Sequence, residues 1–296
     1  MPSEIDEAVT LVPGWSAATI TVEPLPGGRT NRNFLVRVDG SPFVLRIAAP
    51  HAEQLGIHRS DEYAVLRAAA DAGIAPRVIW VDEQRGLLVS EFVIGRHWSP
   101  HDIYRDGNMA RLTAALRTAH ALPVHPSAFD PIALGLQFQA RCDDTLAPPC
   151  LGAIAIDHVR AVASAADETD ARCLCHNDIG RGNFIDDGTR LWLLDWECAG
   201  IGDAFYDLAI VSHNHRLTTA QELDLLRCYH GRASPADVLR LARAKLAHDF
   251  YHVFWYAAHL CTAADPEDLR RCCAFHAARL AFELQAFTPD GSPRHG

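Results

Sequence analysis

The chain has 296 residues, a formal net charge of −10, and a composition that is 49% hydrophobic and 22% charged. That length accommodates one large or two medium-sized domains with a substantial core. The sequence contains no basic run of the kind found in nucleic-acid-binding proteins and no apolar run near the ~18 residues of a membrane span. These properties favour a globular enzyme acting on small molecules, with no nucleic-acid or membrane partner, and leave the oligomeric state open.

The start of the chain and the cysteines both indicate a cytoplasmic protein. Glu4, Asp6 and Glu7 stand where a signal peptide would carry positive charge. The nine cysteines form no CxxC pair and no spacing typical of a zinc site. We therefore expect reduced thiols and a cytoplasmic location. Lys245 is the only lysine, so almost every positively charged side chain is an arginine.

The first third of the chain has the pattern of a small antiparallel sheet with one helix. Glycine-containing turns are expected at 26–28 and 39–40. Apolar residues at helical spacing predict a helix over 59–73, ended by Gly73. Residues 1–94 are therefore expected to form a β-rich N-lobe. Alternating apolar residues predict strands at 20–22, 34–38, 43–47, 78–81 and 87–92.

After Gly95, apolar residues recur at helical spacing and no longer alternate with polar ones. Residues 122–150 are rich in proline and read as a loop, and short strands are expected around 183–195. The chain is thus predicted to have an α+β fold, with a helical C-lobe over 95–296 and a ligand cleft between the lobes. Helices are predicted at 107–121, 151–167, 203–214, 219–230, 235–262 and 266–287.

The segment 173–183 has the features of a catalytic loop for phosphoryl transfer. Asp178 and Asn183 show the D-x-x-x-x-N spacing of kinase catalytic loops. Asp178 is the candidate base that accepts a hydrogen bond from the acceptor hydroxyl, and Asn183 offers a neutral amide oxygen to Mg²⁺. His176 is interpreted as a residue that braces the loop rather than as a catalytic group.

Asp195 follows the apolar run 191–194, so its carboxylate is expected at the tip of a strand, as the main metal ligand. Glu197 is a second candidate ligand, because Mg²⁺ prefers hard oxygen ligands. In the structural alternative, Asp178 and Asn183 form Asx turns and the other two residues are solvated strand ends. The joint spacing of all four residues favours phosphoryl transfer.

Two stretches carry a resemblance to a known family. CHNDIGRGNFIDDGTRLWLLDWECAGIGDAFYDLA (175–209) resembles the aminoglycoside phosphotransferase and choline/ethanolamine kinase superfamily. LPGGRTNRNFLVRVDGSPFVLRI (25–47) is similar to the N-lobe of its choline kinase branch. The resemblance extends over roughly 20–290 and implies a bilobal, protein-kinase-like fold, with ATP as co-substrate, Mg²⁺ as cofactor, and Asp207 as a brace for the catalytic loop.

The resemblance assigns a nucleotide site to the N-lobe. Gly28, Thr30 and Asn31 would meet the phosphates with backbone N–H groups and a hydroxyl, although a plain β-hairpin would look the same. Arg46 stands where related kinases use lysine, and Glu62 would form the ion pair that directs it. Ordinary surface charges are the alternative for this pair. The hinge that would hold adenine consists of Glu91, Phe92 and Val93.

The acceptor pocket is expected in the helical lobe, where an aromatic segment runs from 248 to 256. Choline kinases carry a similar helix, and an aromatic face attracts a cation by about 0.5–2 kcal/mol. Trp255 and Tyr251 are the candidate acceptor contacts, and core packing is the alternative. Asn214 stands where choline kinases place an acidic residue. This departure widens the candidates to ethanolamine, thiamine, an amino sugar or another alcohol.

Three functions are compatible with these residues. The first is an ATP-dependent phosphotransferase acting on a hydroxyl of a small, cationic metabolite. The second is a phosphotransferase for an aminoglycoside or other antibiotic, which would be expected to carry an N-lobe lysine. The third is a catalytically silent pseudokinase that binds nucleotide or a partner. Asp178, Asn183 and Asp195 together favour catalysis, and the missing lysine favours the first function.

Overall fold

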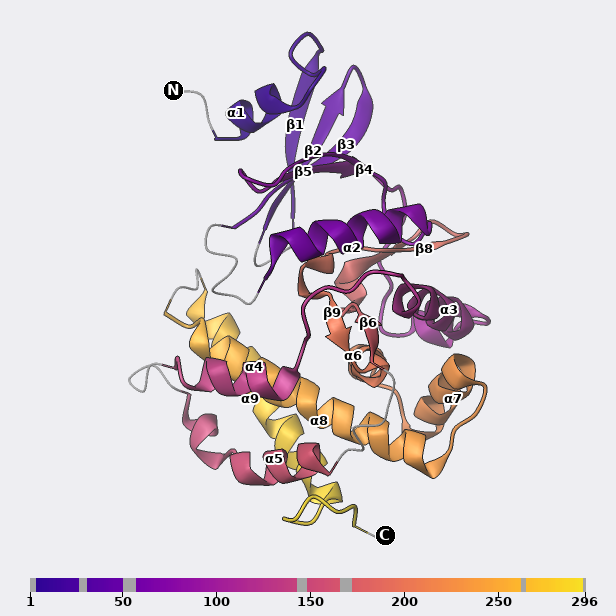
Figure 1. The fold of residues 1–296 in the computed structure, drawn as a ribbon, viewed down its shortest axis with the longest axis vertical. Helices are drawn as coiled ribbons and strands as arrows, with labels where there is room; N and C mark the ends of the chain where they lie inside the picture. The colour runs from indigo at the N-terminus through magenta and orange to yellow at the C-terminus, as the bar shows by residue number, and fades with distance from the viewer. Residues whose placement is uncertain are drawn as a thin grey trace.

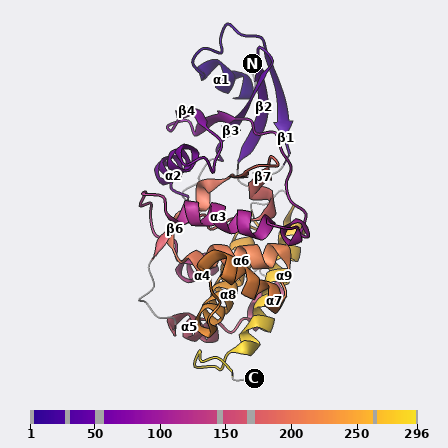
Figure 2. The same cartoon turned by 90° about the vertical axis from the view of Figure 1, so that its right-hand side faces the viewer.

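The computed structural model describes residues 4–26, 31–49, 57–142, 148–165, 172–261 and 265–294. An N-terminal part built on an antiparallel sheet sits above a larger helical part, as Figures 1 and 2 show from two directions. This is the predicted α+β architecture. None of the helices in the described ranges is long and apolar enough to cross a bilayer.

The N-terminal sheet has the strand order β1-β2-β3-β5-β4, and every neighbouring pair is antiparallel. Side chains alternate between its faces, so Leu45 and Ile47 pack with Val9 and Val12 of the N-terminal segment. Arg46 points to the opposite face, toward α2. The elements of this part are α1 (Glu4–Leu11), β1 (Ile20–Leu25), β2 (Arg32–Val38), β3 (Ser41–Ile47), α2 (Arg59–Asp71), β4 (Val78–Asp82) and β5 (Leu87–Glu91).

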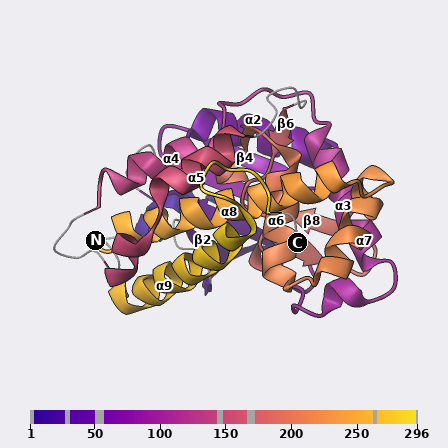
Figure 3. The same cartoon turned by 90° about the horizontal axis from the view of Figure 1, so that it is seen from below.

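The helical part is organised around α8, which packs against α4, α5, α6 and α9. Figure 3 shows α8 and α9 side by side, seen from below. Two short hairpin-like pairs, β6 with β9 and β7 with β8, lie between this bundle and the sheet. The elements are α3 (Asn108–His120), α4 (Pro131–Gln139), α5 (Ile156–Ser164), β6 (Cys173–Cys175), β7 (Phe184–Asp186), β8 (Leu191–Leu193), β9 (Gly200–Gly202), α6 (Ala204–His215), α7 (Thr219–His230), α8 (Pro235–Ala258) and α9 (Pro266–Glu283).

The two parts share one apolar core. Tyr63 and Leu66 of α2 belong to the same buried cluster as Leu112 of α3, Leu174 of β6 and Phe184 of β7. The segment that connects the two parts is also fixed in place, because Arg96 forms a backbone bridge with Asp186. Helix α2 therefore rests on the elements that carry the catalytic loop. The boundary between residues 94 and 95 stays a prediction.

Several predicted elements differ from those observed. A helix, α4, occupies part of the stretch 122–150 that reads as loop, because Asp130 caps it and Pro131 opens it. The helix α1 and the strand β9 were not predicted either. The predicted helix 235–262 ends earlier, at Ala258. Helix α7 coincides with its prediction, since Thr218 and Gln221 form a capping box.

Candidate active site

The loop between β6 and β7 brings Asp178 and Asn183 together. The side-chain amide of Asn183 donates to the Asp178 carboxylate over 2.7 Å and to its carbonyl over 2.8 Å. These bonds use the nitrogen of the amide and leave the oxygen of Asn183 available as a ligand. Burial, with the negative charges of Asp195 and Glu197 nearby, raises the pKa of Asp178 well above its ordinary value.

His176 joins this loop to the strand tip that carries Asp195. Its Nδ1 accepts from the backbone N–H of Asp178 over 3.3 Å, and its Nε2 donates to the carbonyl of Leu194 over 2.8 Å. This pattern requires the neutral ring, and burial lowers the pKa of His176 accordingly. The backbone N–H of Leu194 donates to the carbonyl of Asn183 over 2.8 Å. The loop-bracing interpretation of His176 agrees with these contacts.

Asp207 supports the loop from helix α6. Its fully buried carboxylate accepts from the backbone N–H groups of His176 and Asn177 over 2.8 and 2.7 Å. His120 of α3 adds a third contact of 2.9 Å through its Nε2. Asn177 has a φ of 63°, in the left-handed region, so the Asp207 clamp holds a backbone conformation that few residues adopt.

Asp195 lies opposite Asp178 and also has a left-handed backbone, with a φ of 62°. Burial and the neighbouring Glu197 raise the pKa of Asp195 to about 7. The half-buried Asp195 and the buried Glu197, whose carboxylates repel each other, form together with the amide oxygen of Asn183 a donor set that suits a hard divalent cation. The residues present therefore fit Mg²⁺ chemically.

Arg46 enters the site from β3. It forms an ion pair with Glu62 of α2, and its Nη1 lies 3.9 Å from the Asp195 carboxylate. Burial alone would lower the pKa of Arg46, but the charge and hydrogen bond of Glu62 together with the charges of Asp195 and Glu197 outweigh burial and raise it. The Nε and Nη2 atoms of Arg46 are buried and have no hydrogen-bond partner among the described residues. Two guanidinium donors of Arg46 are thus left without an acceptor among the described residues, beside the equally buried hydroxyl of Tyr63.

Arg59, at the start of α2, is a site residue that the sequence reasoning missed. It donates to Glu62 over 2.7 Å, to Glu197 over 3.2 Å and to the amide oxygen of Asn31 over 3.0 Å. Asn31 in turn donates to the same Glu197 oxygen over 2.7 Å. Glu197 therefore connects the two parts of the molecule, and one of its oxygens is already engaged. The sequence did offer one signal for Arg59, because it stands three residues before Glu62, a spacing at which side chains on a helix meet.

The other predicted nucleotide-binding residues divide into two groups. Gly28 and Thr30 lie outside the described residues. Glu91 is the exposed last residue of β5, and Phe92 and Val93 follow it in the connection to the helical part. This is the place expected of a hinge, and adenine binding there stays a prediction.

The predicted acceptor residues are separated by the structure. Tyr251 is buried, and burial together with Cys198, Asp178 and Glu197 raises the pKa of its phenol well above the ordinary value. Trp255 packs instead at the edge of the bundle core, with its ring 4.5 Å from that of His259. Tyr251 thus lies within the bundle core and near the candidate carboxylates, and Trp255 is half-buried at the rim of the same core, so the contact of either residue with an acceptor stays a prediction.

Tyr206 of α6 was not predicted as a site residue. Its hydroxyl is buried without a hydrogen-bond partner among the described residues, and Tyr251 and Asp178 are among its charged or polar neighbours. Asn214 lies on the other side of the loop, where its amide oxygen is 3.6 Å from the position a side chain on Gly180 would take. It lines a cavity of about 370 Å³ with His97, Trp98, Gly180, Arg181, Gly182 and Asn183.

Fold and site together define a phosphotransferase of the kinase class. The model of the phosphotransferase enzyme family matches residues 21–238, so the chain belongs to this family. Among solved structures, a choline/ethanolamine kinase family protein from Mesorhizobium loti is 28% identical, with a TM-score of 0.77 over 94% of this chain and 93% of that one. These findings confirm the resemblance that the sequence suggested.

Three further relatives have lower sequence identity to this chain. Choline kinase LicA from Streptococcus pneumoniae has a TM-score of 0.81 at 20% identity, covering 96% of this chain and 98% of its own. A thermostable mutant of aminoglycoside phosphotransferase APH(4)-Ia has a TM-score of 0.67 at 17% identity, over 92% and 96%. Protein LicA of Haemophilus influenzae is 24% identical over 209 residues, which span 69% of this chain and 61% of LicA. These neighbours confirm the bilobal, kinase-like fold.

Proposed function

We propose that the protein is an ATP-dependent kinase that phosphorylates a hydroxyl group of a small, cationic metabolite such as choline, ethanolamine or thiamine. One observation carries the proposal. Asp178 and Asn183 are joined by a 2.7 Å hydrogen bond on a loop facing Asp195, with the Arg46–Glu62 ion pair on the other side. This is the set of groups that phosphoryl transfer requires.

Asp178 would accept the hydrogen bond of the acceptor hydroxyl through its carboxylate, orienting that oxygen toward the terminal phosphate. Arg46 would donate its free Nε and Nη2 groups to phosphate oxygens in a fork that an ammonium group does not reproduce. His176 and Asp207 would hold the loop in its conformation without touching the substrate. Catalysis by these residues is therefore mainly positioning.

Asn183 and Asp195 would hold Mg²⁺, with Glu197 as a further carboxylate in reach through its less engaged oxygen. When bound, the ion supplies positive charge that neutralises the phosphate oxygens. It would also relieve the repulsion that raises the pKa of Asp178 and Asp195. A bound Mg²⁺ would therefore reduce the repulsion between these carboxylates in addition to its role in phosphoryl transfer.

A cationic acceptor is supported by three features. The chain carries a net charge of −10, which raises the local concentration of cations. Tyr206 and Tyr251 present phenol groups near Asp178. The solved relative at 28% identity is described as a choline/ethanolamine kinase family protein. Asn214 carries no charge at the position where choline kinases place an acidic residue. The support for choline itself is therefore no stronger than the support for the other cationic acceptors.

The catalytic assignment is tested by Asp178→Asn. This change keeps the size of the side chain but removes the acceptor charge, so we expect kcat to fall by at least about 10³-fold. Binding of Mg-ATP, measured by calorimetry, should stay within a few-fold of the wild type. Asp157→Asn, an exposed aspartate on α5, is the matched control. Full activity in Asp178→Asn would exclude Asp178 as the base.

The acceptor is identified with a panel of choline, ethanolamine, thiamine, amino sugars and an aminoglycoside, using ADP release as the signal. We expect a cationic metabolite to stimulate ADP release most strongly. Stimulation by the aminoglycoside alone would favour the antibiotic phosphotransferase. Tight Mg-ATP binding without turnover on any acceptor, in the wild type and in Asp178→Asn alike, would favour the pseudokinase.

A further inference from the structure

A group of histidines lies in the helical part, outside the residues assigned to phosphoryl transfer. His248 and His252 stand four residues apart on α8, so they share one face of the helix. His276 faces them from α9, and its ring stacks on His252 at 4.9 Å between centroids and 14° between planes. The rings of His248 and His252 are 4.2 Å apart. Three imidazoles thus meet at the α8–α9 interface.

We propose that His248, His252 and His276 form a binding site for a Zn²⁺ ion that joins α8 to α9. Each residue offers a ligand atom within 4.8 Å of the ligand atoms of the other two. A pair of histidines at i and i+4 on a helix, completed by a third residue from another element, is a common arrangement for zinc. Zinc–nitrogen bonds of about 2.0–2.1 Å require the three ligand nitrogens to lie closer together than 4.8 Å, so the rings must reorient when the ion binds.

The Nδ1 atom of each histidine is engaged, which leaves Nε2 for a metal. His252 Nδ1 donates to the carbonyl of His248 over 2.9 Å. His276 Nδ1 donates to the carboxylate of Asp249 over 2.7 Å. His248 Nδ1 lies 3.3 Å from Nδ1 of His213 and 3.5 Å from Asp249. Carbonyl and carboxylate partners of this kind orient the ligands of natural metal sites and fix the tautomer.

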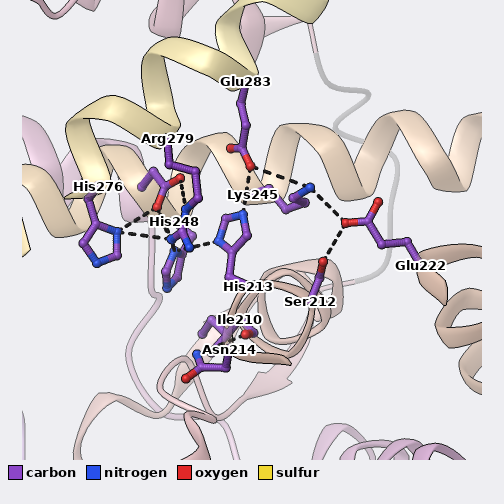
Figure 4. A network of polar contacts seen from close by, with 11 residues as sticks. Ile210, Ser212, His213, Asn214, Glu222, Lys245, His248, His276, Arg279 and Glu283 are labelled. Carbon is purple, nitrogen blue, oxygen red and sulfur yellow. Dashed lines mark hydrogen bonds and ion pairs between the residues drawn. The ribbon is translucent and has the colours of Figure 1, made fainter. Parts of the chain in front are cut away.

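The charges around the cluster are compatible with a cation. Arg279 lies against the Nδ1 edges of His248 and His276, at 3.5 and 3.3 Å. Its charge is neutralised by Asp249, to which its Nε donates over 2.6 Å. Figure 4 shows Arg279 reaching from α9 to the Nδ1 edges of His248 and His276. The fully buried Asp249 thus serves both Arg279 and His276.

The protonation state of the cluster also suits a metal. Burial lowers the pKa of His248 to about 3 and that of His252 well below its ordinary value. Both rings are therefore neutral at physiological pH, and a neutral imidazole is the form that binds metal. Imidazole nitrogen favours zinc and other transition metals over Mg²⁺, which takes oxygen ligands. The site is thus chemically distinct from the one formed by Asn183 and Asp195.

Zinc titration of the full chain tests the proposal. The protein is prepared without a histidine tag, stripped with EDTA and titrated with Zn²⁺ against a coloured zinc indicator. We expect one equivalent to bind in the wild type. His252→Asn and His276→Asn each keep a donor in the place of Nδ1 and lose Nε2, so zinc affinity should fall at least about tenfold. His259→Asn is the matched control, since His259 makes the same bond to a carbonyl on α8 and lies outside the cluster.

Two further readouts separate a real site from adventitious binding. Zn²⁺ should raise the unfolding temperature of the wild type and of His259→Asn, but not of the two cluster variants. Co²⁺ should give the visible absorption bands of a tetrahedral site in the same two proteins. Equal zinc affinity in wild type, His252→Asn and His276→Asn would overturn the proposal, as would less than one equivalent in the wild type. Circular dichroism checks folding, and either cluster variant suffices if the other misfolds.

Discussion

Arg46 shows how one side chain sets the character of the nucleotide site. Its Nη1 is held by Glu62, while its Nε and Nη2 are buried without a partner among the described residues. A lysine at this position would have one nitrogen for both tasks, pairing with Glu62 and binding phosphate. The planar guanidinium divides these tasks between its edges, so the two residue types are not interchangeable here.

Arg46→Lys is therefore expected to weaken ATP binding although the charge is kept. The predicted rise in KM for ATP is about tenfold, equivalent to about 1.4 kcal/mol, with a smaller fall in kcat. Arg37→Lys, on an exposed position of the neighbouring strand β2, controls for the general effect of the exchange. Steady-state kinetics at saturating acceptor measures both values. Unchanged KM in Arg46→Lys would remove Arg46 from the phosphate site.

At the scale of elements, helix α6 and the catalytic loop behave as one unit through Asp207. Its carboxylate receives two backbone N–H groups of the loop and the ring of His120. Asp207→Asn places an amide NH₂ against one of these donors and removes the buried charge. We expect a loss of about 2–4 kcal/mol in the free energy of unfolding, measured by urea denaturation, and a lower kcat.

Asp203→Asn is the control for this change. Asp203 caps the same helix by accepting from the N–H of Phe205, and asparagine caps helices about as well as aspartate. The loss there should stay below about 1 kcal/mol. Equal losses in the free energy of unfolding in the two variants would show that Asp207 stabilises α6 no differently from Asp203 and does not clamp the loop.

The sequence predicted those elements whose signals are local. Helix α7 has a capping box at Thr218 and Gly231 at its end, and both signals can be read without tertiary structure. The spacing of Asp178, Asn183 and Asp195 was likewise visible. Helix α4 was missed because its apolar residues lack a clear period and proline surrounds it.

What the sequence did not reveal depends on contacts between distant segments. Arg59 reaches Glu197 across 138 positions of the chain, and no local pattern announces such a pairing. The left-handed backbone of Asn177 is likewise held by tertiary hydrogen bonds, not by local preference. Trp255 was favoured over Tyr251 by residue type alone, and residue type does not reveal that the charge of Asp178 acts on Tyr251.

At the scale of the whole molecule, stability should depend on pH through buried histidines. Burial lowers the pKa of His213 and His248 from 6.5 to about 3. Unfolding exposes them, and below pH 6.5 the unfolded chain takes up protons that the folded chain does not. Their contribution is therefore complete above pH 6.5 and is lost as the pH falls toward 3. Glu283, Asp178 and Asp195, whose pKa values are raised by burial and nearby negative charge, offset part of this uptake. His176 and His252, whose pKa values burial also lowers, add to it.

We expect the urea midpoint, measured in EDTA, to fall between pH 7 and pH 5. Each histidine contributes a slope of about 1.4 kcal/mol per pH unit. His248→Asn removes one such group and should flatten the dependence by that amount. His58→Asn, a partly exposed histidine whose side chain does not cap α2, is the control and should keep the wild-type slope. An unchanged slope in His248→Asn would contradict this account.

The single lysine has a practical consequence for detecting this protein. Lys245 lies in the helical lobe, paired with Glu222 over 2.9 Å. Reagents that label kinases by acylating a lysine beside the bound nucleotide find no side-chain amine next to Arg46. A survey of cellular ATP-binding proteins by such chemistry would pass over this enzyme even when its nucleotide site is occupied. An arginine-directed reagent such as a dicarbonyl suits the site better.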